Sequence, residues 1–467
     1  MARVRQNFLY KLLLTFSNYI LGFVTLPYIT RVLGPEKFGE VNFVMNTVDY
    51  FILFASMGVM TIGTREIAMN KESRPDISRV ASDILALNLA FTAVVLLTYN
   101  LSVLIVPSFG RFNDLFWIGN AKILFWALLV EWFFTGIENF RYITIRSLII
   151  KTLYVGLVFI FVKTTKDYKL YFILTVLSFV VNAVVNFGYY WKQIGIQFRK
   201  VNLKKYLKPN LKLGTYTIMT SMYITFNVIF LGMVSDMNEV GYYSASLKLY
   251  FVILSIFSAF TGVMLPRMAA IVNSGDKSQF FDYLNKSYHL VFLFAFPILF
   301  VSLFLAPEII GILAGNGYKP AVAPMRILMC ALPFVWLSQV ISVQGLAAIK
   351  KDSILLWGAI IGALCSLIIN VCLTPSYGAV GSSIVLVASE CCVTLFSVLR
   401  VRSLRLFPLP SVKMILSYLL CSLPIIIVGA CAHWIDNIIL RVIIIGLTGG
   451  VVAAFTLLGF RRRMLSN

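Results

Sequence analysis

Charged residues are scarce in this 467-residue chain, and most of them are basic. Asp, Glu, Lys and Arg make up 13% of the residues and hydrophobic residues 60%, whereas about 25% charged residues is usual for a soluble domain. The mean hydropathy is +0.88. Because helices of a soluble core are rarely apolar all round, one very large soluble core is excluded. Uninterrupted apolar runs such as 414–431 also exclude a transmembrane β-barrel, whose strands alternate.

Cysteine is missing from the first half of the chain, and there are only two histidines, His289 and His433. The seven cysteines have neither C-x-x-C nor Cys/His ligand spacing, so no metal site and no disulfide are predicted. An ATP-binding motif of the form G-x-x-x-x-G-K-[ST] is missing as well, so no cofactor is expected. Energy for any transport would then come from an ion gradient or from consumption of the product.

No segment between the apolar runs is long enough to form a separate domain. Acidic residues on the outer side are scattered over different loops, so the chain is predicted not to be an enzyme. The formal net charge of +21 would ordinarily suggest nucleic acid. Here the basic residues are spread over short loops, so nucleic acid is not an expected partner. Part of the excess charge can attract anionic membrane lipids.

The long apolar runs predict membrane-spanning helices, each of which needs about 20 residues. We therefore predict an all-α polytopic membrane protein with about 14 spans, near residues 8–30, 40–62, 82–107, 114–135, 143–162, 170–191, 213–234, 241–265, 287–314, 321–346, 353–373, 379–399, 414–434 and 442–460. Placing both termini in the cytoplasm puts 28 of the 40 Lys and Arg residues on the cytoplasmic side and 9 outside. This bias predicts that orientation. The loop 163–169, with three lysines on the outer side, runs against it.

The two halves of the chain repeat each other with an offset of 202 residues. Gly39 recurs as Gly241, Arg65 as Arg267 and Ala68 as Ala270. Both sets bracket the second span of a half. Since six spans separate the copies, the repeat is parallel, as in transporters that enclose a central cavity. The expected organisation is an N-lobe at 1–200, a C-lobe at 201–405 and two additional spans at 406–467.

Polar residues form stripes on the spans that the repeat equates. Asn18 lies in span one, Asn46 and Asp49 in span two, Asn227 in span seven and Lys248 in span eight. Ionisable groups are costly in lipid, about 2.5–3.5 kcal/mol on insertion scales, and usually face protein or water. We expect these residues to line a hydrated cavity. The alternative is hydrogen bonding between packed helices.

Further ionisable groups occur inside spans. Asp49, Glu131 and Glu390 are candidates for ion or proton coupling, and Lys122 either lines the pathway or pairs with a carboxylate. For Glu390 the alternative is a buried carboxyl that is hydrogen-bonded or protonated. Glu131 and Glu138 are seven residues apart, so they are expected to share a helix face.

Several motifs resemble the polysaccharide transporter family that includes Wzx-type O-antigen flippases. From residue 23 to about residue 393 these are FVTLPYITRVLGPEKFGEVNFV, GTREIA, GYYSASLKL, LPRMAAI, GNGYKPAVAPMRILMCALPF and YGAVGSSIVLVASECCV. The resemblance implies the fold of the multidrug/oligosaccharidyl-lipid/polysaccharide exporters. It also implies movement of undecaprenyl-diphosphate-linked oligosaccharide to the outer leaflet of a bacterial cytoplasmic membrane. Implied partners are this lipid-linked substrate, membrane lipids, and polysaccharide polymerase and chain-length enzymes.

The resemblance also implies which charged residues belong to the family's motifs. These positions are Arg31, Arg65, Lys248, Arg267, Arg326 and Glu390. Arginine suits the geometry of a diphosphate. Arg31 and Arg326 fall at outer ends of spans, where capping of helices is the alternative.

Two other functions remain open. One is an ion-coupled drug/cation antiporter of the same superfamily, whose cavity should be rich in carboxylates and aromatic residues. The other is a membrane-embedded polysaccharide-processing enzyme, which should carry a large outer loop or a His/Asp/Glu cluster. The mixed charges within the spans, Lys122 and Lys248 beside Asp49 and Glu390, favour an anionic substrate.

Overall fold

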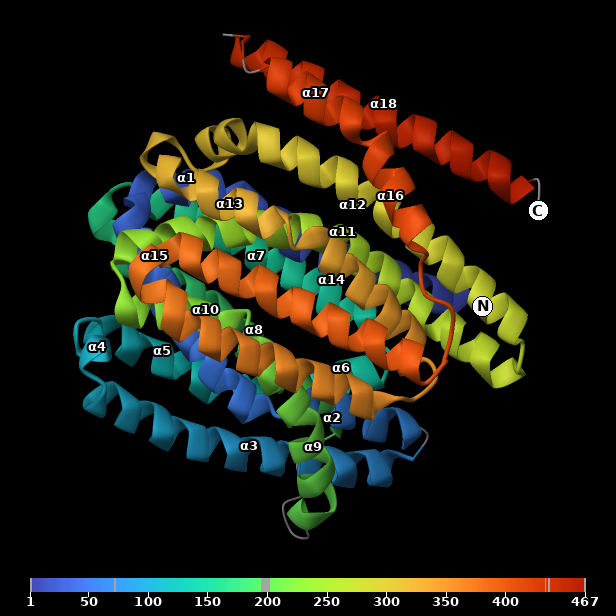
Figure 1. Ribbon diagram of the computed structural model, residues 1–467. Coiled ribbons are helices and arrows are strands. Elements are labelled where there is room, and N and C mark those ends of the chain that lie inside the picture. Colours follow the sequence, from blue (N-terminus) through green and yellow to red (C-terminus); the bar gives the residue numbers. More distant parts are fainter. Residues whose placement is uncertain (1, 71–72, 195–201, 433, 436, 466–467) are drawn as a thin grey trace. The chain divides into compact units, whose positions relative to one another are not determined.

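Helices account for nearly the whole structure. The computed structural model describes residues 2–70, 73–194, 202–432, 434–435 and 437–465, which hold helices and turns but no strand (Figure 1). The all-helical fold class is therefore confirmed. In the described part of the chain, ten helices are long and apolar enough to cross a membrane, or up to twelve if two bent helix pairs each count as one span.

The chain forms two compact units, Met1–Gly241 (the N-terminal unit) and Tyr242–Asn467 (the C-terminal unit). The helices of the first are α1 (Ala2–Ser56), α2 (Val59–Met69), α3 (Arg74–Ile105), α4 (Pro107–Gly110), α5 (Asn113–Trp126), η1 (Ala127–Leu129), α6 (Glu131–Gly136), α7 (Phe140–Phe161), η2 (Thr165–Asp167), α8 (Tyr168–Ile194), α9 (Leu203–Ser221) and α10 (Thr225–Val234). Those that follow are α11 (Met237–Ser274), α12 (Lys277–Leu313), η4 (Asn316–Ala321), α13 (Val322–Met329), α14 (Leu332–Gln339), η5 (Val340–Ala347), α15 (Asp352–Ser403), α16 (Val412–Cys421), α17 (Leu423–Ala432) and α18 (Ile438–Leu465). The predicted lobes at 1–200, 201–405 and 406–467 remain a prediction.

Two of the longest helices are interrupted by a glycine. Gly34 in α1 has φ 71° and ψ 173°, and Gly378 in α15 has φ 51° and ψ −127°. Positive φ is accessible to glycine because it lacks a Cβ atom. Each helix thus consists of two parts, which correspond to predicted spans one and two and to spans eleven and twelve. The count of 14 stays a prediction, since it requires α1 and α15 each to cross the membrane twice.

Two predicted spans of the N-terminal unit are also broken within their length. Met57 (φ 38°) separates α1 from α2 at a bend of 41°, and Val130 (φ 38°) separates η1 from α6. The short helices α2 and α6 pack closely, because a Cβ atom on Gly63 would lie 2.9 Å from the Trp132 ring. Helices broken at membrane depth are tolerated where the freed backbone groups are buried in protein or line a cavity.

The C-terminal helices pack on α12 within the C-terminal unit. Arg441 of α18 forms an ion pair with Glu308 of α12 at 2.6 Å, and both side chains are largely buried. A Cβ atom on Gly429 of α17 would lie 2.4 Å from the Phe304 ring. The ion pair and the close helix contact therefore hold this hairpin against α12.

Candidate functional site

An ion pair lies between two predicted spans of the N-terminal unit. The Nζ of Lys122, on α5, donates to the Oδ1 of Asp49, on α1, at 2.5 Å. The Lys122 side chain is 12% exposed and that of Asp49 is 44% exposed. The ammonium also lies 5.8 Å from the centre of the Phe179 ring. Lys122 is therefore a nearly buried cation whose charge is compensated by one half-open carboxylate.

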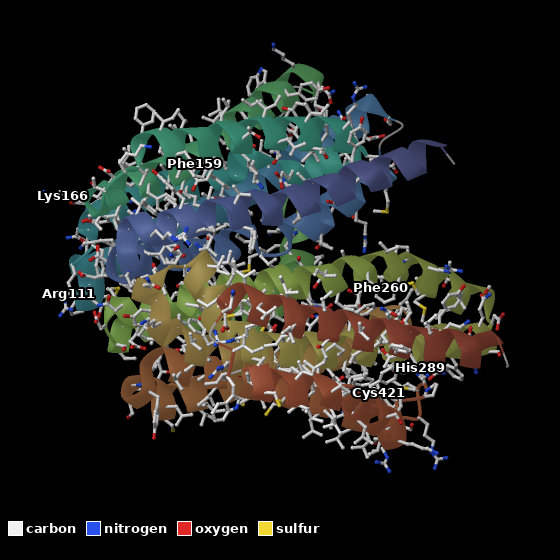
Figure 2. All side chains as sticks on the ribbon, turned by 90° about the horizontal axis from the view of Figure 1, so that it is seen from above. Arg111, Phe159, Lys166, Phe260, His289 and Cys421 are labelled. Carbon is white, nitrogen blue, oxygen red and sulfur yellow. The ribbon has the colours of Figure 1, made fainter. Side chains whose placement is uncertain are left out.

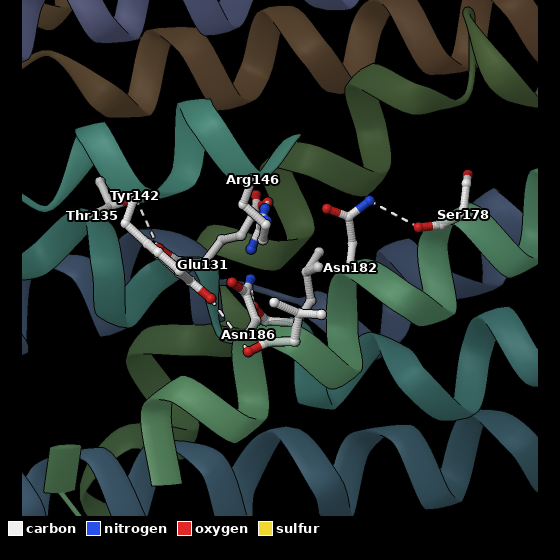
Figure 3. Close-up of polar contacts among 9 residues, drawn as sticks. Glu131, Thr135, Tyr142, Arg146, Ser178, Asn182 and Asn186 are labelled. Atoms are coloured by element: carbon white, nitrogen blue, oxygen red, sulfur yellow. Dashed lines mark hydrogen bonds and ion pairs between the residues drawn. The ribbon is translucent and has the colours of Figure 1, made fainter. Parts of the chain in front are cut away.

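A second ion pair forms at the break between η1 and α6. Glu131 is the first residue of α6, where a carboxylate is favoured by the helix dipole. Its Oε1 accepts a hydrogen bond from Nη2 of Arg146, on α7, at 3.1 Å. The Arg146 side chain is only 5% exposed, and its Nε and Nη1 have no hydrogen-bond partner in the described part of the protein. Figure 3 shows this pair beside the broken helix.

Glu138 does not share a helix face with Glu131, so that expectation is wrong. α6 ends at Gly136, and Glu138 has a left-handed backbone with φ 59°. The 3.6-residue periodicity therefore does not continue from one glutamate to the other.

Two asparagines of α8 flank this break, and the sequence analysis missed both. Nδ2 of Asn186 donates to the backbone oxygen of Leu129 at 2.5 Å, and Nδ2 of Asn182 donates to that of Ser178 at 2.8 Å (Figure 3). The Oδ1 atoms of both asparagines are buried without a partner among the described residues. Their spacing of four residues inside an apolar span was the available signal.

In the C-terminal unit, the carboxylate of Glu390 is an ionisable group buried within a predicted span. Glu390, on α15, is 8% exposed. Within the described residues, its carboxylate has neither an ion pair nor a hydrogen bond. The neighbouring Thr394 hydroxyl bonds the backbone oxygens of Glu390 and Phe334. A buried carboxyl without a compensating charge is costly in lipid and usually functional.

Two glutamines, one immediately before the π-helix η5 and one inside it, were also missed. Nε2 of Gln339 donates to the Ser258 hydroxyl at 3.0 Å, and its Oε1 accepts from Thr261 at 3.3 Å, both on α11. Oε1 of Gln344 accepts from Ser287, on α12, at 2.7 Å. π-Helical turns occur frequently at functional sites. These glutamines connect the wide turn of η5 to two neighbouring helices.

The Arg326 side chain hydrogen-bonds the backbone of α12 next to a proline. Pro307 lacks an N–H, so the Leu303 carbonyl, four residues earlier on α12, has no helical donor. Nε of Arg326 donates to this carbonyl at 2.9 Å. Arg326 also borders an apolar cavity of about 410 Å³ lined by Phe300, Phe304 and Ile426. The contact favours the interpretation of Arg326 as a residue that caps a kinked helix.

The other predicted cations lie near helix ends or on helix surfaces. Arg31 is exposed on α1, and Arg65 is exposed on α2, 3.9 Å from Glu66. Arg267 is exposed on α11 and contacts the hydroxyl and the ring of Tyr283. Lys248 is partly buried on the same helix. None of these placements by itself assigns a substrate contact.

Some side chains of the polar stripes form hydrogen bonds with the backbone of their own helix. Nδ2 of Asn46 donates to the Asn42 carbonyl at 2.7 Å, and Nδ2 of Asn227 donates to the Tyr223 carbonyl at 3.1 Å. Asn18 lies outside the residues whose side chains are described. Of the predicted site residues, the structure brings Asp49 and Lys122 into contact, and the cavity itself stays a prediction.

Sequence comparison decides the family. The pattern of the family described as "Polysaccharide biosynthesis protein" matches residues 4–272, which is more than half of the chain. The chain belongs to this family. The resemblance inferred from the motifs is therefore confirmed.

Full-length relatives support the assignment. A protein of Escherichia coli (strain K12) named "Putative O-antigen transporter" is 26% identical over 411 residues, covering 86% of this chain and 98% of the relative. A protein of the same name from Shigella dysenteriae is 25% identical over 405 residues, covering 85% and 100% of the two chains.

Solved structures show the same fold. The lipid II flippase MurJ, in an inward closed conformation, matches with a TM-score of 0.78 at 18% identity, over 98% of this chain and 99% of its own. An inward-facing MATE family multidrug transporter of the MOP superfamily matches with a TM-score of 0.58 at 16% identity, over 84% and 95%. The family member described here is thus a polytopic α-helical membrane protein with the fold that MurJ and the MATE transporters share.

Proposed function

We propose that this protein is a flippase that moves a lipid-linked oligosaccharide from the inner to the outer leaflet of a bacterial cytoplasmic membrane by alternating access. The proposal is carried by the relation, over nearly the full length, to proteins named as O-antigen transporters. The fold shared with a lipid II flippase supports it. The same names favour a transporter over an enzyme. The proposed cargo is an undecaprenyl-diphosphate-linked oligosaccharide, with polymerase and chain-length enzymes as proposed partners.

Lys122 has the properties that a diphosphate cargo requires. Its ammonium is nearly buried, so its attraction to an anion is screened less than at the surface. Among the described residues, Asp49 is the carboxylate that pairs with this charge. We propose that the diphosphate replaces Asp49 as the partner of Lys122 during passage, and that the polar stripes hydrogen-bond the sugar hydroxyls. Asp49, Glu131 and Glu390 are the proposed sites of ion coupling.

The test is reconstitution in liposomes with a fluorescent undecaprenyl-diphosphate oligosaccharide. A membrane-impermeant reagent reports how much of the lipid has reached the accessible leaflet. We expect protein-dependent exchange that Lys122→Met abolishes. Absence of any protein-dependent movement contradicts the proposal.

An ion-coupled drug/cation antiporter is the second candidate. It is favoured by the fold likeness to a multidrug MATE transporter and by the uncompensated carboxylate of Glu390. The same liposomes discriminate the two functions. Uptake of a lipophilic cation such as ethidium against an imposed proton gradient, without movement of the lipid-linked oligosaccharide, supports the antiporter.

A further inference from the structure

Three turns of the N-terminal unit meet around a polar cavity of about 290 Å³. Its lining comes from α1 just after Gly34, from the α4–α5 turn and from the start of α8. Figure 2 shows Arg111 and Lys166, from two of these turns, at the same end of the unit. Each turn connects an odd-numbered predicted span to the next even-numbered one. In the predicted orientation this end faces the outside of the cell.

Charged side chains dominate the cavity. Nζ of Lys37 donates to Oε1 of Glu40 at 2.6 Å, and Lys169 pairs with Asp114. Arg111 also lines the cavity and is exposed, and its guanidinium makes no hydrogen bond or ion pair with the described residues. The lining therefore has three cations and two carboxylates, with one guanidinium left over.

This cavity gives a reason for part of the charge that runs against the positive-inside bias. Lysines in outer loops weaken the signal that sets topology. Lys163 is used structurally, because its Nζ bonds the Phe159 carbonyl. Lys169 lines the cavity, whereas Lys166 is exposed and does not. One of the three lysines in the loop 163–169 thus serves the cavity.

We propose that this cavity, the outer pocket, binds an acidic sugar residue of the saccharide that the protein delivers. A guanidinium presents two parallel N–H donors that match a carboxylate. Carboxylates such as those of Glu40 and Asp114 accept hydrogen bonds from sugar hydroxyls, and the Asn113 amide can donate and accept. The volume lies at or below the lower limit for drug-sized ligands, about 300 Å³. It therefore suits a single sugar ring rather than a chain.

The identity of the saccharide rests on the proposed function, but binding is measured without transport. The full-length protein is placed in nanodiscs of phosphatidylcholine and titrated with tetragalacturonic acid, and with neutral maltotetraose for comparison. We expect saturable binding of the acidic probe and none of the neutral one at the same concentrations. Since one charge-assisted contact is lost, Arg111→Ala should weaken binding about tenfold to a hundredfold.

Lys166→Ala is the matched control, because it removes one exposed cation from the same end without touching the lining. It should bind the acidic probe within about twofold of the wild type, as expected for a solvent-screened surface charge outside the lining. Equal losses for Arg111→Ala and Lys166→Ala, no effect of Arg111→Ala, no binding of the acidic probe, or equal binding of maltotetraose would each overturn the inference. Loss of binding when phosphatidylglycerol replaces phosphatidylcholine would instead assign the pocket to a lipid headgroup.

Leaflet exchange measured on the same preparations keeps the two proposals apart. Binding of the acidic probe without exchange contradicts the flippase and leaves the outer pocket standing. Exchange without binding of the acidic probe contradicts the outer pocket and leaves the flippase standing.

Discussion

Asp49 and Lys122 offer a double-mutant cycle that separates folding from transport. The variants are Asp49→Asn, Lys122→Met and the two combined. Unit charges about 4 Å apart attract by about 4 kcal/mol at an effective dielectric constant of 20, and a hydrogen bond to a charged group contributes about 1.5–3 kcal/mol. Because the Asp49 side chain is 44% exposed, the lower part of that range applies. Asp49→Asn should therefore cost about 1.5–2 kcal/mol, since it leaves the ammonium without its partner.

Lys122→Met should cost less, about 1 kcal/mol, because the half-open carboxylate of Asp49 is more easily solvated than the buried ammonium. The double variant should be more stable than Asp49→Asn, since no unpaired charge remains. Thermal unfolding of the detergent-solubilised protein measures the relative stability of the three variants. In liposomes, however, the double variant should remain inactive, because the cation for the diphosphate is gone.

The matched control is Asp282→Asn with Lys286→Met, an ion pair at 2.6 Å whose side chains are 50% and 37% exposed. An exposed pair contributes little, so these changes should alter stability by less than about 1 kcal/mol and leave transport intact. Flipping by the Asp49→Asn/Lys122→Met variant at the wild-type rate would refute the role given to Lys122. Strictly additive stability losses would refute the ion pair itself.

Three further predictions concern other parts of the chain. Glu308→Ala should destabilise the protein by about 3–5 kcal/mol, because it leaves the Arg441 guanidinium buried and unpaired; thermal unfolding checks this, and a loss below about 1 kcal/mol contradicts it. Gly63→Ala should cost about 1–3 kcal/mol through overpacking against Trp132, whereas Gly156→Ala, with no atom within 4 Å of its added Cβ, should not destabilise; equal melting temperatures would show that α2 and α6 do not pack this closely. Glu390→Gln should preserve the fold and abolish the response of flipping to an imposed proton or sodium gradient; an unchanged response excludes Glu390 as the coupling site.

Hydropathy was sufficient to predict the class of protein, and the motifs were sufficient to predict its family. A bilayer requires every backbone polar group to be satisfied inside a helix or a closed barrel, so long apolar runs leave few alternatives. The same reasoning singled out Asp49, Lys122, Glu131 and Glu390 within the predicted spans, but not Arg146 or Glu308, which form buried ion pairs. It overlooked Asn182, Asn186, Gln339 and Gln344, because uncharged amides in membrane helices are common packing residues.

Periodicity failed where helices end unexpectedly. Glu131 and Glu138 seemed to share a face only as long as one helix was assumed to run through both. The left-handed backbone at Val130 and at Glu138 interrupts the helix on either side of α6, and the spacing of residues along the chain does not record these interruptions.

The amino-acid sequence alone thus determined that this is an all-helical membrane protein of the polysaccharide biosynthesis family, since composition and motifs are local properties of the chain. Only the tertiary structure decided which charges meet. Lys122 pairs with Asp49, 73 positions away, and Arg326 caps the Leu303 carbonyl that Pro307 leaves without a donor. Lys37, Arg111 and Lys169 gather around one pocket. These pairings depend on the rotation and packing of each helix, which neighbouring helices set and hydropathy does not encode.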